Sequence, residues 1–153
     1  MSIADRILRV KSSLPGQVEL VAVSKTYPAQ RIMEAYEAGQ RIFGENRPQE
    51  MAQKYEELPK DIEWHLIGHL QTNKIKKVLG RASLIQSVDS EHLLAAIEKE
   101  AAKAGIVQDI LLEVNIGGEA SKSGVSPEQL WPLLDAAAAE EHRYEGELNG
   151  IPN

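Results

Sequence analysis

The sequence contains no cysteine, which excludes disulfide bonds and thiolate metal sites and suits a reducing compartment. It also lacks an excess of basic residues, since 17 lysines and arginines stand against 23 aspartates and glutamates, giving a net charge of −6. Binding nucleic acid needs a basic face, so no nucleic-acid partner is expected. No apolar run is long enough to cross a bilayer, and the N-terminus lacks the basic and apolar regions of a signal peptide. We therefore expect a cytoplasmic protein that binds no membrane.

What the sequence does contain is a regular alternation of short apolar runs with amphipathic stretches, over a length typical of one domain. Strands are predicted at residues 18–23, 41–43, 62–67, 84–88 and 110–115. Helices are predicted at residues 2–12, 29–38, 45–58, 72–79, 90–105 and 126–141. Five strand-helix alternations predict parallel strands joined by right-handed crossovers. Either an open doubly wound sheet or part of a β/α barrel satisfies this pattern.

Lys25 stands at the end of the first predicted strand, after the apolar run Val21-Ala22-Val23. The carboxyl ends of parallel strands form the rim of the sheet, where ligands bind. Burial among apolar strand residues would disfavour an ammonium group, and a neutral amine attacks carbonyl carbons. Lys25 is therefore a candidate Schiff-base residue. The alternative is a solvated lysine at the start of a loop.

Two further strand ends carry polar residues. Asn46 follows Phe43-Gly44-Glu45 and is placed to hydrogen-bond a ligand at the rim; the alternative is that Glu45 and Asn46 cap the following helix. His65 and His69 are four residues apart but on a strand and turn with no third ligand, so zinc is not expected. We favour a histidine that hydrogen-bonds within the strand ends, and a Gly68 that lets the backbone approach a ligand.

The segment Gly117–Gly124 resembles a phosphate-binding loop, but the glycines required before a Lys122-Ser123 pair are absent. What remains is a hydroxyl-rich loop from which Lys122 could reach an anion, or else a solvated lysine. The sequence has no Gly-x-Ser-x-Gly elbow and no cysteine nucleophile, which disfavours a hydrolase.

Taken together, five segments over about residues 18–141 resemble, in order and spacing, the motifs of the pyridoxal 5′-phosphate (PLP) homeostasis proteins. They are Val23-Ser24-Lys25-Thr26, Phe43–Glu50, Trp64–Lys74, Ser87-Val88-Asp89-Ser90 and Glu113–Gly124. The resemblance implies a TIM-type β/α barrel like the N-terminal domain of alanine racemase. It also implies that PLP is held as a Schiff base on Lys25, and that the protein stores the cofactor or delivers it to PLP-dependent apoenzymes without robust catalysis.

The same resemblance places Asn46, His65, Gly68 and His69 at the cofactor pocket and Lys122 near its mouth. Many relatives carry a second lysine where this chain has Tyr27, which leaves any contact made by that lysine in doubt. An enzyme, either racemase-like or a lysine-dependent aldolase, is the alternative function. It would need a positioned acid/base partner, for which Tyr27 is the one tyrosine at a strand end after Lys25.

A full β/α barrel takes about 250 residues, so residues 1–141 are expected to form an incomplete PLP-binding barrel of about five parallel strands. Residues 142–153 form an atypical tail, which we expect to be too polar for a barrel strand. The phosphate cup of the family lies beyond the matched segments, so PLP binding should be weakened. Exposed barrel edges should drive oligomerisation, and a cofactor-free barrel fragment is the remaining alternative.

Overall fold

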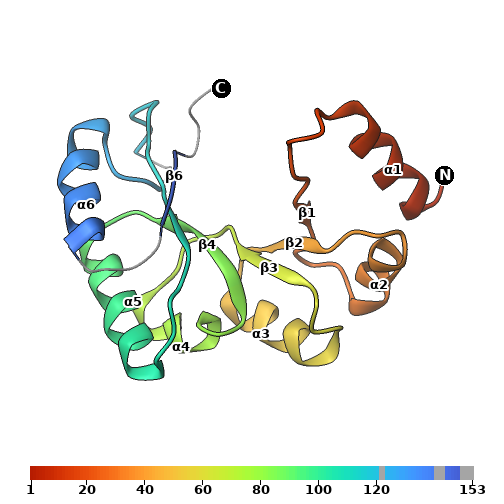
Figure 1. The fold of residues 1–153 in the computed structure, drawn as a ribbon, viewed down its shortest axis with the longest axis horizontal. Coiled ribbons are helices and arrows are strands. Elements are labelled where there is room, and N and C mark those ends of the chain that lie inside the picture. The colour runs from red at the N-terminus through yellow and green to blue at the C-terminus, as the bar shows by residue number, and fades with distance from the viewer. Residues whose placement is uncertain (121–122, 140–143, 149–153) are drawn as a thin grey trace.

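The computed structural model describes residues 1–120, 123–139 and 144–148. In these residues six parallel strands form one sheet (Figure 1). The strands are β1 (Ala22–Val23), β2 (Ile42–Glu45), β3 (Glu63–Leu66), β4 (Ala82–Val88), β5 (Ile110–Leu112) and β6 (Tyr144–Leu148). The helices are α1 (Ile3–Ser13), α2 (Ala29–Glu37), α3 (Pro48–Glu57), α4 (Ile75–Val78), α5 (Glu91–Ala104) and α6 (Pro127–Ala139), with a 3₁₀ turn at Thr72–Lys74 before α4.

The order of the strands across the sheet is their order along the chain, from β1 to β6. In a doubly wound sheet the order in which strands are added reverses, so that later strands lie on the other side of the first strand. In a β/α barrel each new strand lies beside the one before it. Figure 1 shows the helices outside a curved sheet, with β1 and β6 at its two separate ends. The predicted partial barrel is therefore confirmed, and the doubly wound alternative is wrong.

The core lies between the outer face of the sheet and the helices. Side chains alternate between the two faces of a strand, so every second strand residue points to the helices. The largest fully buried side chains are Trp64, Phe43, Met51, Leu66, Leu70, Ile75, Ile85, Leu94, Ile97, Ile110, Leu112 and Leu133. Each fully buried side chain of this kind contributes about 1.5–3 kcal/mol relative to its exposed state, so this layer fixes the strand ends in space.

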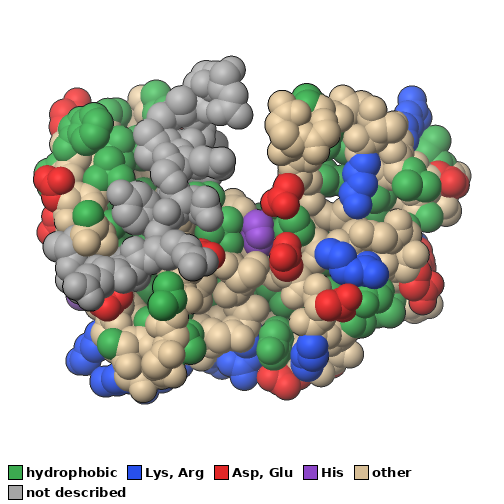
Figure 2. Space-filling view, viewed as in Figure 1, with side chains coloured by type: hydrophobic (Ala, Val, Ile, Leu, Met, Phe, Trp, Pro, Cys, Tyr) green, Lys and Arg blue, Asp and Glu red, His purple; other side chains and the backbone are tan. Residues whose placement is uncertain are grey.

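The inner face of the sheet is more open. Val23, Gly44 and His65 are register partners on β1, β2 and β3 and share this face. Val23 is 50% exposed, and His65 is half-buried. Figure 2 shows a histidine and acidic side chains at the surface beside the N-terminal part of the molecule. Polar groups on the inner face are therefore accessible.

Three predicted boundaries need correction. The helix expected at 45–58 begins only at Pro48, because Glu45 still belongs to β2 and is fully buried. The first strand, expected at 18–23, is limited to its last two residues. The strand expected at 110–115 ends at Leu112, and Val114 instead makes an isolated bridge to Val125.

The expectation that residues 142–153 are too polar for a barrel strand is wrong for Tyr144–Leu148, which form β6 and pair with β5. A strand is paired through its backbone, and the sequence Tyr-Glu-Gly-Glu-Leu alternates in the period-two pattern typical of a half-buried strand. The prediction looked for a continuous apolar run and missed this alternation. Within the described ranges, no helix is long and apolar enough to span a membrane.

Candidate functional site

The carboxyl ends of β1, β2 and β3 bring three of the predicted site residues to one rim of the sheet. The backbone N–H of Ser24 donates to the carbonyl of Gly44 at 2.9 Å, which continues the β1–β2 pairing beyond Val23. Lys25 and Asn46 each lie two residues beyond the last register pair, Val23 and Gly44. His65 pairs with Gly44 on the other side of β2. Lys25 and Asn46 therefore follow neighbouring strand ends and His65 lies near the end of β3; that the three form one site stays a prediction.

Lys25 has an exposed side chain, so the predicted burial among apolar strand residues is wrong. The strand ends at Val23, and Lys25 follows in the turn before α2. Its amine is accessible to a small molecule. The next residue, Thr26, has a φ of 67°, a left-handed conformation that is rare for a β-branched residue.

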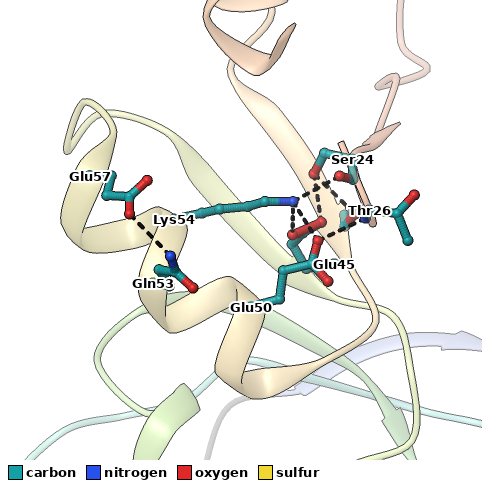
Figure 3. A network of polar contacts seen from close by, with 8 residues as sticks. Ser24, Thr26, Glu45, Glu50, Gln53, Lys54 and Glu57 are labelled. Carbon is teal, nitrogen blue, oxygen red and sulfur yellow. Dashed lines mark hydrogen bonds and ion pairs between the residues drawn. The ribbon is translucent and has the colours of Figure 1, made fainter. Parts of the chain in front are cut away.

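A cluster of charged groups, which we call the triad, contacts both chain neighbours of Lys25 and consists of Glu45, Lys54 and Glu50 (Figure 3). The ammonium of Lys54 contacts Glu45 Oε1 at 2.5 Å and Glu50 Oε1 at 2.8 Å. It also donates to the backbone carbonyl of Ser24 at 2.9 Å. Glu45 Oε2 accepts a hydrogen bond from Ser24 Oγ at 2.9 Å, and Glu50 Oε1 accepts one from the backbone N–H of Thr26 at 2.7 Å. The triad therefore joins α3 to β2 and to the segment around Lys25.

The two carboxylates of the triad have opposite electrostatic environments. Burial raises the pKa of Glu45, opposed by its hydrogen bonds to Lys54 and Ser24. The hydrogen bond from Lys54 lowers the pKa of Glu50, which is nearer the surface. Glu50 is thus held as a carboxylate at neutral pH.

Asn46 and Gly68 are in direct backbone contact. A Cβ at Gly68 would lie 2.4 Å from the carbonyl oxygen of Asn46 and 2.8 Å from its Cα. Gly68 is thus required by Asn46, whereas its predicted approach to a ligand stays a prediction. The alternative that Glu45 and Asn46 cap α3 is wrong: the N-cap is Arg47, and no side chain hydrogen-bonds there.

His65 is oriented by Gln86 on the neighbouring strand β4. Its Nδ1 lies 2.8 Å from Nε2 of Gln86. An amide nitrogen only donates, so Nδ1 accepts and the ring proton resides on Nε2. Burial lowers the pKa of His65 below 6.5, opposed by the charge of Glu19. His65 is therefore a neutral imidazole at pH 7 with Nε2–H as a donor.

His69 is exposed, and its Nδ1 lies 3.4 Å from a carboxylate oxygen of Asp89. It lines a cavity of about 310 Å³ at the same rim; the lining residues are Asn46, Arg47, Pro48, Gln49, His69, Gln71 and Lys74. Glu113, after β5, faces the same region: burial raises its pKa, Asp89 adds to the effect, and His69 opposes it.

Lys122 lies outside the described residues, so its predicted place at the pocket mouth stays a prediction. No three His, Asp or Glu side chains in the described ranges could hold a metal ion together. Sequence reasoning missed the triad and Gln86. The i, i+4 spacing of Glu50 and Lys54 was a signal for one pair, but nothing local marked Glu45 as their partner.

Comparison with known proteins gives a consistent relationship. The family model for the N-terminal domain of alanine racemase matches residues 1–150. A pyridoxal phosphate homeostasis protein of Aquifex aeolicus is 50% identical over 118 residues, which are 76% of this chain and 52% of that protein. The chain thus spans about half the length of the curated relatives it matches.

A solved protein, PipY of Synechococcus elongatus, is similar over nearly the whole chain. Its structure without PLP has 37% sequence identity and a TM-score of 0.90, over 99% of this chain and 74% of PipY. Its structure with PLP bound has 36% identity and a TM-score of 0.84, over 98% and 73%. The chain belongs to the family of the alanine racemase N-terminal domain, within the group of the pyridoxal phosphate homeostasis proteins.

Proposed function

We propose that this chain binds PLP as a Schiff base on Lys25 and acts as a carrier of the cofactor, not as an enzyme. The observation that carries the proposal is the accessible amine of Lys25 at the rim that Asn46 and His65 also reach. The similarity to PipY, which has been solved with PLP bound, supports the same ligand.

The residues present fit an aldehyde with polar ring substituents. When bound, PLP would supply the carbonyl with which the amine of Lys25 condenses, with loss of one water molecule. The amide of Asn46 both donates and accepts hydrogen bonds, and His65 offers its Nε2–H. Gln86 keeps that donor fixed. The weakened binding expected from the sequence stays a prediction.

A carrier is proposed over an enzyme because the curated relatives are pyridoxal phosphate homeostasis proteins, and because Tyr27, the acid/base candidate from the sequence, lies outside the cavity that Asn46 lines. Tyr27 lines a cavity of about 410 Å³ with residues of α1, α2 and the end of β1, including Arg6, Arg31 and Ser24. This is not the cavity that Asn46 and His69 line. The absence of cysteine supports the further prediction that the protein works in the cytoplasm.

The direct test is chemical trapping. The purified chain is mixed with PLP, reduced with borohydride, digested and mapped by mass spectrometry. We expect a near-visible absorption band that borohydride bleaches, and the added mass on the peptide containing Lys25. Lys25→Met should abolish both, whereas Lys103→Met, on an exposed lysine of α5, should abolish neither. A folded chain without the adduct at Lys25 would exclude the proposal.

The carrier role is tested separately by incubating the loaded chain with a PLP-dependent apoenzyme and following recovery of that enzyme's activity. With a PLP scavenger present in both reactions, we expect the activity of the apoenzyme to recover faster with the loaded chain than with free PLP. Turnover of amino-acid enantiomers or aldol substrates that depends on Lys25 would instead show an enzyme.

A further inference from the structure

Both chain neighbours of Lys25, Ser24 and Thr26, are tied to the triad (Figure 3). Lys25 itself is exposed. Ser24 is held twice, through its carbonyl by Lys54 and through its hydroxyl by Glu45. Thr26 is held through its backbone N–H by Glu50. The backbone of Lys25 is thus fixed on both sides by one cluster of charges from α3 and β2.

The conformation that is held in this way is unfavourable by itself. Thr26 has a φ of 67°, and a β-branched residue in this left-handed region is strained. Such strain persists where the surroundings over-determine the backbone, and it is concentrated at functional sites. Here the hydrogen bond to Glu50 is the contact that opposes relaxation of Thr26.

The triad is also a costly way to stabilise a fold. The side chains of Lys54 and Glu45 are 7% and 0% exposed, so both charges have lost most of their hydration. Buried ion pairs are weak contributors to net stability, because desolvation offsets much of their attraction. A role in fixing geometry explains this arrangement better than a role in overall stability.

The triad further separates two lysines that differ in chemistry. The Lys54 ammonium contacts two carboxylates and a carbonyl and is closed off from solvent. It is therefore not available to react with an aldehyde, whereas Lys25 has an exposed amine.

We propose that Glu45, Lys54 and Glu50 are positioning residues that clamp Ser24 and Thr26 and thereby direct the amine of Lys25 toward the rim. The inference rests on the proposed attachment of PLP to Lys25. In this arrangement the clamp determines how fast, and how selectively, Lys25 reacts compared with other exposed lysines.

The test uses Glu50→Ala, because the Glu50 side chain is partly exposed and its removal leaves Lys54 paired with Glu45. Glu56→Ala is the matched control: it makes the same substitution on the same helix and breaks only the ion pair with Arg81. The first readout is hydrogen exchange of the Thr26 amide by NMR, without PLP. We expect exchange to become about tenfold faster or more in Glu50→Ala, as for the loss of one hydrogen bond to a charged group, and to be unchanged in Glu56→Ala.

The second readout is the site of the borohydride-trapped PLP adduct. In the original chain the adduct should concentrate on Lys25; in Glu50→Ala a larger share should appear on other lysines, and the rate at Lys25 should fall. Thr26→Asn in the Glu50→Ala background should restore part of the selectivity, because asparagine tolerates the left-handed conformation. A general loss of stability would not be corrected by this local change.

The outcomes are distinct. A Lys25 adduct that forms in Glu50→Ala with unchanged rate and selectivity would overturn the clamp and leave the proposed function intact. If the original chain folds but forms no adduct at Lys25, both the clamp and the proposed function are excluded. If Glu50→Ala does not fold, Glu50→Met replaces it in every comparison, since it keeps the approximate volume of the side chain and removes the oxygen that accepts from Thr26.

Discussion

Gly68 occupies a position that a larger residue does not fit, because the backbone of Asn46 lies against its Cα. This contact joins the segment after β2 to the segment after β3, and it holds Asn46 where the rim needs it. A side chain at position 68 must therefore displace a candidate ligand-binding residue as well as strain the backbone.

We expect Gly68→Ala to destabilise the chain by about 1–3 kcal/mol, the range for overpacking a well-filled site, and to weaken PLP binding at the same time. Gly16→Ala is the control, since a Cβ there has nothing within 4 Å. Urea unfolding followed by circular dichroism measures the stability of the two variants, and titration with PLP measures their binding. Equal stability of the two variants would contradict the contact.

His65 predicts a dependence of stability on pH. Its pKa in the folded chain is below the ordinary value of 6.5 because burial disfavours the imidazolium. At a pH between the folded-state pKa and 6.5, the unfolded chain binds more protons at His65 than the folded chain does. The free energy of unfolding should therefore fall as the pH falls through about 6.5, by at most about 1.4 kcal/mol per pH unit.

The measurement compares unfolding midpoints between about pH 7.5 and about pH 5.5. His65→Gln should remove this component of the slope, whereas His92→Gln, at an exposed position of α5, should leave it unchanged. An unaltered slope in His65→Gln would refute the assignment.

Lys25 and Asn46 could be placed after β1 and β2 from the sequence because an apolar run comes shortly before each, and His65 could be placed on β3 because it lies within an apolar run. The contacts and exposure of these residues could not be predicted from the sequence. The exposure of Lys25 depends on where β1 ends, and the Gln86 contact depends on the register between β3 and β4. Neither is encoded in a local pattern.

Helix α3 packs on the sheet and also carries Glu50 and Lys54, and Lys54 pairs with the buried carboxylate of Glu45 at the end of β2. Removing only the cation would leave Glu45 buried without its partner. The cost of such a change is set by the unpaired charge, not by the loss of a surface contact.

Lys54→Met should therefore destabilise the chain by about 3–5 kcal/mol at neutral pH. Lys103→Met, which breaks an exposed ion pair with Glu100, should cause almost no change. Thermal and urea unfolding of the two variants provide the comparison, and similar values for both would show that the triad is energetically unimportant.

Elements with strong periodicity were predictable, and their ends were not. Helix α5 begins after a Ser90 cap and ends at Gly105 in the left-handed conformation, as the sequence indicated. Glu45 looked like a helix-initiating acid because the cation that draws it into the core lies nine residues later. Strand β6 was missed because its pairing partner, and not its hydrophobicity, defines it.

The whole molecule is an open arc, since β1 and β6 are the terminal strands of the sheet in the described residues. Unpaired strand edges and a partly exposed inner face favour association with other chains. The oligomerisation expected from the sequence stays a prediction.

We expect the molecular mass in sedimentation experiments to rise with concentration. Val23→Lys, at a 50% exposed position of β1, should reduce this association, whereas Val107→Lys, at a 67% exposed valine between α5 and β5, should not. A monomer at all concentrations would show that the edges are already protected.

The strand order has a consequence for how the chain acquires its structure. Each strand pairs with the strand synthesised just before it, so a nascent chain emerging from the ribosome always finds its next partner already in place. Because neighbouring strands are consecutive in the sequence, each new pairing closes one crossover and no longer loop, which limits the entropic cost of each step. Among the six described strands, the strand end before Lys25 is thus made first, and it becomes fixed only once α3 has followed.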